Sequence, residues 1–364
     1  MTDLLVTAVT PTLDSGTGLR TYGVVAALAR DHPIDVAYVV WGSDRPALAY
    51  AALPDVTLRG LHASRGPRRV LEYLRTRARG GPSRLARGVS PELAAAGRAA
   101  PPGTRVIADG PAPAAALLSL ARAREVVYLA HNLESSGFRG TAPGLRQFER
   151  RVLRTFSESW MATRADERDA RALAGETIVT RYVPNVIDTS TIKPVAPAGA
   201  RRLLFVGDFS YEPNREAFEF FTGTVLPAVW RRTPDVHLTA VGRGLPAVSR
   251  DPRIETPGFV DDLAGAYGAA DVVVVPLLRG GGSPLKFIEG LAYGLPVVAS
   301  AHATRLLEDG VPGRDFLAAG DAAEFSQAIE GLLADPVRAA AIGAAGRELV
   351  THCYSVEALI SSLR

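Results

Sequence analysis

Residues 272–300 read VVVVPLLRGGGSPLKFIEGLAYGLPVVAS, and this stretch decides the fold. Its four leading valines predict a short buried strand, which a glycine-rich loop follows. A helix is predicted from Pro284 to Tyr293, with Ser283 as its N-cap and Pro284 as its first residue. The apolar run Pro296–Ser300 predicts the next strand. Strand, loop, helix and strand in this order indicate a βαβ unit of a parallel sheet.

The same alternation extends along the chain in both directions from this unit. Apolar runs such as Leu4–Val9 and Leu203–Val206 precede loops with glycine and then helical stretches. We therefore predict an α/β protein with two Rossmann-like, doubly wound parallel-sheet domains at residues 1–185 and 186–345. Residues 346–364 are expected to form a C-terminal helix, with the N-terminal domain as one candidate for its packing partner. Ligands of such domains bind at the carboxyl ends of the strands, so we expect a cleft between the two sheets.

Length and composition agree with two globular domains. The chain has 364 residues, 47% of them hydrophobic and 22% charged, which allows sizeable cores. Its longest apolar runs are far shorter than the roughly 18 residues that span a bilayer, and its start does not resemble a secretory signal. The single cysteine, Cys353, excludes an internal disulfide and suits the reducing cytoplasm. We expect a cytoplasmic protein, with membrane association as an open alternative.

Several motifs that would indicate other chemistry are absent. Neither of the two lysines, Lys193 and Lys286, follows a glycine, which excludes a Walker A loop. The glycines after the first strand do not have the spacing of a dinucleotide fingerprint. No H-E-x-x-H or G-x-S-x-G motif occurs, and no Asp-x-Asp pair is present to hold a divalent ion on a diphosphate. The sequence predicts no metal site and no bound cofactor.

The loop before the predicted helix has the features of an anion site. Glycines at a helix N-terminus expose backbone N–H groups, and the helix dipole adds positive potential there. Lys286 in the first turn opposes that dipole unless an anion is bound, and Glu289 lies three residues on, on the same face. A lysine could bind a phosphate here while the carboxylate accepts hydrogen bonds from a ribose. The alternative is a plain glycine turn with a surface ion pair between residues i and i+3.

The motif K-x-x-E-x-x-x-x-G-x-P-V-V within Gly280–Ser300 resembles the donor site of retaining glycosyltransferases of the GT-B fold, family 4, in a subgroup with a G-G-G-x-x-L-K-x-x-E motif. The likeness extends to four further stretches: PNVID at 184–188, LFVGD at 204–208, GFV at 258–260 and YLAHNLE at 128–134.

This resemblance implies transfer of a sugar from a nucleotide diphosphate donor, a UDP- or GDP-sugar, with retention and without a metal. Residues 186–345 would bind the donor, and residues 1–185 would bind a glycan, lipid-linked or small-molecule acceptor. The residues that it places in catalysis are His131, Lys286 and Glu289. The residues that it places around the donor are Gly16, Gly18, Gly207, Asp208, Phe259, Val260, Arg279, Gly280, Gly281, Gly282, Ser283, Pro284 and Leu285. Glu134 either orients the loop after this strand or is simply exposed. The alternative for His131 is a purely structural role at the end of the strand.

The sequence also departs from the family pattern. The first glutamate of the usual E-x7-E pair falls on Gly281, and the usual arginine and lysine after the donor-domain strand fall on Asp208 and Asn214. Without that cationic pair, Arg279 and Lys286 are the candidates for binding the diphosphate. These departures keep other functions open: a GT-B-fold sugar-nucleotide epimerase or phosphorylase, a catalytically silent partner protein, or a membrane-bound scaffold.

An arginine-rich segment spans residues 65–87. Its arginines are interrupted by apolar residues, which is typical of an amphipathic helix on a membrane surface or of a site for an anionic acceptor. The alternative is a solvated helix in a chain that favours arginine over lysine. Nucleic acid is disfavoured as a partner because no aromatic residues alternate with the arginines in the way that base stacking requires. The segment comprises Arg65, Arg68, Arg69, Arg75, Arg77, Arg79, Arg84 and Arg87.

Overall fold

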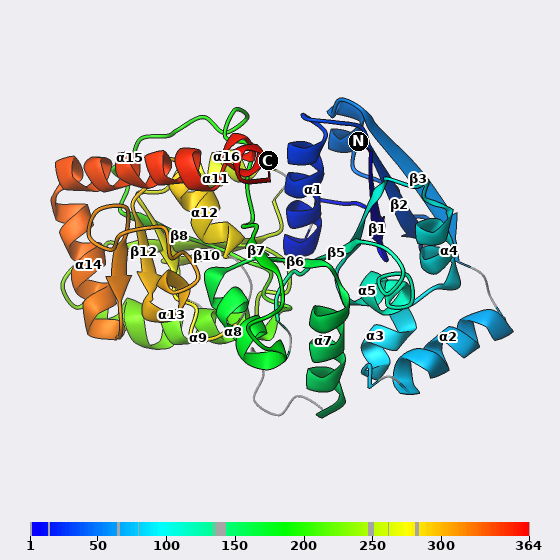
Figure 1. Ribbon diagram of the computed structural model, residues 1–364. Coiled ribbons are helices and arrows are strands. Elements are labelled where there is room, and N and C mark those ends of the chain that lie inside the picture. The colour runs from blue at the N-terminus through cyan, green and yellow to red at the C-terminus, as the bar shows by residue number, and fades with distance from the viewer. Residues whose placement is uncertain are drawn as a thin grey trace. The chain divides into compact units, whose positions relative to one another are not determined.

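A computed structural model describes residues 2–13, 15–63, 66–78, 80–133, 135, 143–246, 251–260, 262–280 and 284–363. The chain forms two compact units (Figure 1). The N-terminal unit runs to Val186 and includes the chain's end from Leu359, and the C-terminal unit holds the described residues from Ile187 to Ala358. Each unit has its own parallel sheet and its own core.

The N-terminal unit is built on a seven-stranded parallel sheet with the order β3-β2-β1-β4-β5-β6-β7. Every residue of the interior strand β1 is buried, which shows that both faces of the sheet are covered there. The strands are β1 (Asp3–Thr7), β2 (Ile34–Val40), β3 (Val56–His62), β4 (Arg105–Asp109), β5 (Val126–Leu129), β6 (Glu158–Met161) and β7 (Thr180–Tyr182). Helical segments are α1 (Gly16–Leu28), η1 (Leu48–Ala52), α2 (Pro67–Ala78), α3 (Ser83–Gly88), α4 (Pro91–Ala99), α5 (Pro111–Leu117), α7 (Pro143–Thr155) and α8 (Arg164–Ala174).

The C-terminal unit has a six-stranded parallel sheet with the order β10-β9-β8-β11-β12-β13. Alternate residues of its strands face two different cores: Leu203 and Phe205 enter one, and Leu204 and Val206 enter the other. The strands are β8 (Arg202–Val206), β9 (His237–Val241), β10 (Ile254–Gly258), β11 (Val272–Val275), β12 (Val297–Ser300) and β13 (Leu317–Ala319). Helical segments are α9 (Glu212–Phe220), η2 (Phe221–Val225), α10 (Leu226–Trp230), α11 (Leu263–Gly268), α12 (Leu285–Ala292), α13 (Ala301–Thr304), α14 (Ala322–Ala334) and α15 (Pro336–Cys353). The last helix, α16 (Val356–Leu363), begins in this unit and ends in the N-terminal unit.

Two local predictions differ from the structure. Helix α12 begins at Leu285, so Pro284 precedes the helix and is not its first residue, because its ψ of 82° is not helical. The tail forms two helices where one was expected. The backbone leaves the helix at Tyr354, whose carbonyl accepts a hydrogen bond from Ile187 N at 2.9 Å, and Ser355 forms a parallel bridge with Ile187. The break between α15 and α16 is therefore a result of strand-like pairing.

Candidate functional site

Lys286 and Glu289 form an ion pair on the first turns of α12. Lys286 Nζ lies 2.7 Å from Glu289 Oε2, as the i,i+3 spacing predicts. About a third of the lysine side chain and a fifth of the glutamate side chain remain exposed, so a ligand can reach both. An exposed ion pair of this kind contributes little to the stability of the fold. Breaking it so that Lys286 contacts a phosphate and Glu289 a ribose would therefore cost little free energy. The geometry fits both the anion-site hypothesis and the surface ion-pair alternative.

Glu289 has a second partner that sequence reasoning missed. Tyr267 on α11 is fully buried, and its hydroxyl donates to Glu289 Oε2 at 3.1 Å. Burial, followed by the negative charge of Glu289, raises the pKa of Tyr267 well above its usual value, so the phenol stays protonated and remains a donor. The Tyr267 ring also stacks on Tyr293, with 4.2 Å between the ring centroids. Glu289 is thus fixed in orientation from the core side.

Arg279 follows β11 and is already paired with acidic groups. Its Nε and Nη2 atoms each donate to Glu216 on α9 at 2.7 Å, and Nη2 lies 3.3 Å from Glu212. The hydrogen bonds from Arg279 lower the pKa of Glu216, so this carboxylate stays ionised. Arg279 could therefore bind a diphosphate only if the diphosphate replaced these carboxylates as its partner. Its predicted role in donor binding would need that rearrangement.

The loop after β8 uses its polar groups internally. Asp208 Oδ1 accepts hydrogen bonds from Ser210 N at 3.0 Å and from Ser210 Oγ at 2.5 Å, and Asn214 Nδ2 donates to the Asp208 carbonyl at 2.8 Å. Packing requires glycine at position 242, just after β9, because a side chain there would overlap the Gly207 carbonyl. Asp208 therefore stabilises the conformation of this loop through hydrogen bonds within it.

The remaining predicted donor residues lie at strand ends and around α12. Phe259 follows β10 with 56% of its surface exposed, and the Arg243 guanidinium lies over its ring at 4.7 Å. Val260 packs against the core. The Gly280 carbonyl lies 2.8 Å from His302 Nε2, whereas Pro284 and Leu285 are buried. Gly281, Gly282, Ser283 and Glu134 lie outside the described residues.

In the N-terminal unit, His131 lies two residues after β5 and close to an acidic group. Its Nε2 atom is 2.9 Å from Asp109 Oδ1, at the end of the neighbouring strand β4. The other carboxylate oxygen, Asp109 Oδ2, accepts a hydrogen bond from Thr21 Oγ1 at 2.9 Å. Asp109 and Thr21 were not among the predicted site residues. The available signal was that Asp109 ends an apolar strand, as His131 nearly does.

Gly16 and Gly18 begin α1 at the carboxyl end of β1. Gly16 is the first residue of the helix, and Gly18 N donates to Oγ of the N-cap Ser15 at 3.0 Å. A side chain at Gly18 would overlap the Thr12 carbonyl, so packing alone demands glycine there. This contact favours the plain βα turn that the sequence left as an alternative.

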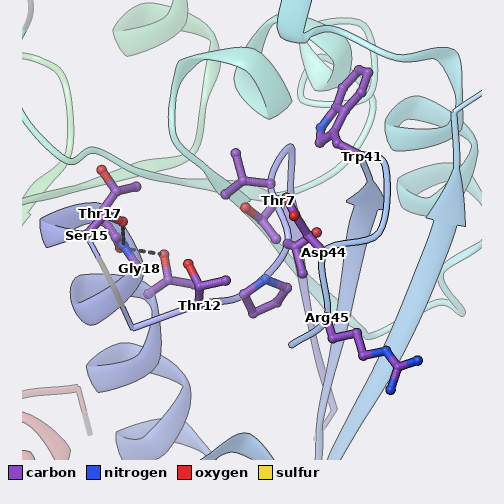
Figure 2. A pocket seen from close by; sticks show the side chains of 12 residues that line it. Thr7, Thr12, Ser15, Thr17, Gly18, Trp41, Asp44 and Arg45 are labelled. Carbon is purple, nitrogen blue, oxygen red and sulfur yellow. Dashed lines mark hydrogen bonds between the residues drawn. The ribbon is translucent and has the colours of Figure 1, made fainter. Parts of the chain in front are cut away.

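A cavity of about 470 Å³ opens beside this turn (Figure 2). Figure 2 shows Thr12, Ser15 and Thr17 near the start of α1, and Trp41, Asp44 and Arg45 on the segment after β2. Five of the twelve lining residues are threonines, which suits a ligand with many hydrogen-bonding groups. The lining residues are Thr7, Val9, Thr10, Pro11, Thr12, Ser15, Thr17, Gly18, Thr21, Trp41, Asp44 and Arg45.

A fully buried arginine connects the strand ends of this unit. Arg20 on α1 donates to the carbonyls of Ala130 at 3.0 Å and Val183 at 2.6 Å, and to Asn185 Oδ1 at 3.0 Å. Burial lowers the pKa of Arg20 to about 10, although the charge of Asp109 opposes this shift. The side chain therefore remains a cation near neutral pH. Sequence reasoning missed it, because nothing in the pattern of α1 distinguishes a buried arginine from an exposed one.

The arginine-rich segment includes α2, which has an exposed apolar stripe. Val70, Leu71 and Leu74 are 57%, 46% and 56% exposed. Glu72 pairs with Arg75 at 2.7 Å, and the Arg69 guanidinium lies over the ring of Trp41 at 4.6 Å. Trp41 also lines the cavity, so its contact with Arg69 places α2 beside the cavity. Arg65, Arg79 and the side chain of Arg84 lie outside the described residues.

Solved structures confirm the fold class. The chain matches sucrose-phosphate synthase from Thermosynechococcus elongatus with a TM-score of 0.75 at 21% identity, covering 100% of this chain and 97% of that one. It matches HepE of Anabaena, solved in complex with UDP and glucose, with a TM-score of 0.75 at 15% identity, covering 99% and 98%. The two parallel-sheet domains are those of GT-B glycosyltransferase structures.

Sequence comparison then finds relatives of the C-terminal unit. Residues 200–335 match the family described as glycosyl transferases group 1. A phosphatidyl-myo-inositol mannosyltransferase of Mycobacterium leprae is 30% identical over 60% of this chain, which spans 59% of that relative's length. A GDP-mannose-dependent α-(1-6)-phosphatidylinositol monomannoside mannosyltransferase of Mycolicibacterium smegmatis is 35% identical over 34% of this chain, and the match spans 37% of that relative. Within the C-terminal unit, residues 200–335 are therefore similar to group 1 glycosyltransferases.

Two kinds of feature are absent from the described ranges. None of the helices seen there combines the length and the apolar character that crossing a bilayer requires. Within the same ranges, no three histidine, cysteine, aspartate or glutamate side chains gather as ligands for a metal ion.

Proposed function

We propose that this protein transfers a sugar from a nucleoside diphosphate sugar to an acceptor, with retention of configuration, as a GT-B glycosyltransferase of family 4. The Lys286–Glu289 pair at the start of α12, inside the group 1 domain, is the observation that carries the proposal. Two charged groups of opposite sign on one helix face suit a ligand that presents a phosphate beside a diol. The C-terminal unit would bind the donor and the N-terminal unit the acceptor.

The chemistry follows from the charges that develop during glycosyl transfer. Cleavage of the glycosidic bond leaves negative charge on the departing diphosphate and positive character on the sugar. Lys286 would stabilise the diphosphate, together with the positive end of the α12 dipole. Glu289 would accept hydrogen bonds from the ribose hydroxyls, held in orientation by Tyr267. We propose a metal-independent reaction because these protein groups supply the positive charge that the leaving group needs.

The relatives suggest which donor should be tested first. Both are mannosyltransferases, one of them named as GDP-mannose-dependent, whereas the HepE structure contains UDP. GDP-mannose is therefore the first donor to test, and UDP-sugars are the second. The acceptors in the relatives' names are phosphatidylinositol lipids. We propose a polyol headgroup of a membrane lipid as the acceptor.

Replacing Lys286 with alanine tests this assignment. We expect affinity for GDP or UDP to fall roughly tenfold to a hundredfold, because a charge-assisted hydrogen bond contributes about 1.5–3 kcal/mol. Affinity for guanosine or uridine should remain unchanged, because neither nucleoside carries a phosphate. Calorimetric titration of the wild type and of Lys286→Ala with each ligand measures these affinities. Lys193→Ala is the control, because it removes the other lysine. Equal losses for nucleotide and nucleoside would contradict the phosphate role. A wild-type chain that binds no nucleotide would favour a catalytically silent protein.

Helix α2 provides a means of reaching such an acceptor. We propose that its apolar stripe and arginines bind an anionic lipid surface, and a double variant, Leu71→Ser with Leu74→Ser, tests this. Flotation with phosphatidylglycerol vesicles should show a loss of binding of roughly tenfold or more, since each buried leucine contributes about 1.5–3 kcal/mol. Leu48→Ser removes an exposed leucine outside α2 and should float like the wild type. If the double variant floats like the wild type, α2 is a solvated helix that does not bind the vesicle surface.

A further inference from the structure

Helix α13 holds the segment that leads from β11 toward the glycine-rich loop, residues 277–280. The N-cap of this helix, Ser300, donates a hydrogen bond from its hydroxyl to the Leu277 carbonyl. His302 lies two residues further on, and its Nε2 atom is 2.8 Å from the Gly280 carbonyl oxygen. Both contacts run from α13 to backbone carbonyl groups, so they act directly on the path of the chain.

Gly280 needs such an external contact, because its own backbone preference fixes little. Its φ of +121° lies in the region that favours glycine, and glycine has the widest choice of backbone conformations. A residue without a side chain is held through its backbone groups. In a trans peptide the carbonyl and the N–H point in opposite directions, so a hydrogen bond that fixes one of them fixes the other. The contact with His302 therefore sets the orientation of the Gly280 peptide group.

The imidazole of His302 is neutral near pH 7 and has a defined tautomer. Burial lowers the pKa of His302, and the charge of Arg305 acts in the same direction, although the hydrogen bond with Gly280 opposes the shift. A carbonyl oxygen can only accept, so Nε2 carries the hydrogen and donates it to Gly280. A guanidinium can only donate, so Nδ1 is the acceptor for Arg305 Nη2, which lies 3.4 Å away. His302 is thus a directional donor to the Gly280 carbonyl.

The direction of this carbonyl affects how an anion could bind before α12. Glycine-rich loops and helix N-termini bind anions through their N–H groups. A carbonyl oxygen carries partial negative charge and repels a phosphate placed beside it. In the proposed function a diphosphate binds beside Lys286, in the first turn of α12. While His302 holds the Gly280 carbonyl, this oxygen cannot turn toward the phosphate without breaking a hydrogen bond.

We propose that His302 is a positioning residue for the diphosphate of the donor: it holds the Gly280 carbonyl toward α13 and so keeps this oxygen from facing the phosphate. The identity of the ligand, a nucleoside diphosphate, rests on the proposed glycosyl transfer. His302 acts through the Gly280 peptide group and needs no contact with the phosphate.

Calorimetric titration of the full chain with GDP and with guanosine tests this role in the wild type, His302→Ala and His302→Gln. We expect His302→Ala to bind GDP roughly threefold to tenfold more weakly, because one orienting hydrogen bond is lost. Guanosine carries no phosphate, so its affinity should stay within about twofold. His302→Gln should restore GDP affinity to within about twofold of the wild type, because the glutamine amide offers an N–H group in place of Nε2.

Thr304→Ala is the matched control on the same helix. Thr304 Oγ1 donates to the Ala301 carbonyl within α13 at 3.1 Å, so its removal leaves the contact with Gly280 in place. This variant should bind GDP and guanosine like the wild type. Melting temperatures separate a loss of binding from a loss of fold, and His302→Ala should melt within about 3 °C of Thr304→Ala.

Three results would overturn the role of His302: unchanged GDP affinity in His302→Ala, equal losses for GDP and guanosine, or no rescue by His302→Gln. A wild type that binds GDP no more tightly than guanosine would overturn it together with the phosphate role of Lys286. If the variants behave as expected but the wild type does not cleave GDP-mannose in the presence of phosphatidylinositol, this donor and acceptor assignment is refuted. The role of His302 in binding the diphosphate then stands.

Discussion

A Glu289→Ala variant should bind GDP or UDP roughly tenfold to a hundredfold more weakly than the wild type. In the proposed complex this carboxylate accepts hydrogen bonds from the ribose, and each such bond to a charged group contributes about 1.5–3 kcal/mol. Guanosine and uridine should lose as much affinity as their diphosphates, since the ribose is common to all four ligands. Calorimetric titration with the four ligands measures both losses. This pattern is the opposite of the one expected for Lys286→Ala.

Tyr267→Phe is the companion variant for Glu289. The carboxylate would keep its charge and its ion pair with Lys286 but lose the hydrogen bond from the phenol. We expect a loss of a fewfold, smaller than for Glu289→Ala and equal for nucleoside and nucleotide. If Glu289→Ala bound nucleosides with wild-type affinity, the ribose role would be refuted, and the pair would be an ordinary surface ion pair.

Arg20→Met should lower the stability of the fold more than any of the substitutions at the two candidate sites. The side chain is buried, and its loss would leave the Ala130 and Val183 carbonyls without their donor and Asp109 without a nearby cation. Removing one partner from a buried charged network costs about 3–5 kcal/mol. For a domain of this size that corresponds to a fall in melting temperature of roughly 6–20 °C, which calorimetry would measure.

Arg171→Met is the matched control for that measurement. Arg171 belongs to the same unit, but its contacts are exposed to solvent: the guanidinium donates to Thr180 Oγ1 at 2.9 Å and lies 4.0 Å from Glu167. The loss of these exposed contacts should change stability by less than about 1 kcal/mol. A melting temperature for Arg20→Met within about 2 °C of the control would show that water replaces the guanidinium, and that the network adds little stability.

The fold followed from the sequence because local pattern and tertiary structure agree in this chain. Valine runs such as Val272–Val275 are buried on both faces of a sheet, and glycines after the strands allow the close approach of loops, as at Gly242. Helix ends were less accurately predicted. Pro284 is compatible with a first helical position, but its ψ of 82° is not helical. The pairing of Ile187 with Ser355 is a long-range contact that no local pattern reveals.

The candidate site was predictable only where its residues are close in sequence. The i,i+3 spacing placed Lys286 and Glu289 on one face. By contrast, the partners of Arg279 and Glu289 come from other helices, and 88 residues separate Thr21 from Asp109. Such contacts depend on which strands are neighbours in the sheet. A single sequence contains little information about the order of strands in a sheet. These partners were therefore identified only from the structure.

The tight packing at Gly18 and Gly242 affects how alignments of such proteins should be interpreted. Both positions exclude any larger residue on steric grounds, because backbone carbonyl groups occupy the space that a methyl group would need. An alignment would show them as invariant columns even among homologues that have lost catalytic activity. Invariance at Lys286 would be more informative about function, because about a third of its side chain is exposed and it fills no space that the fold itself requires.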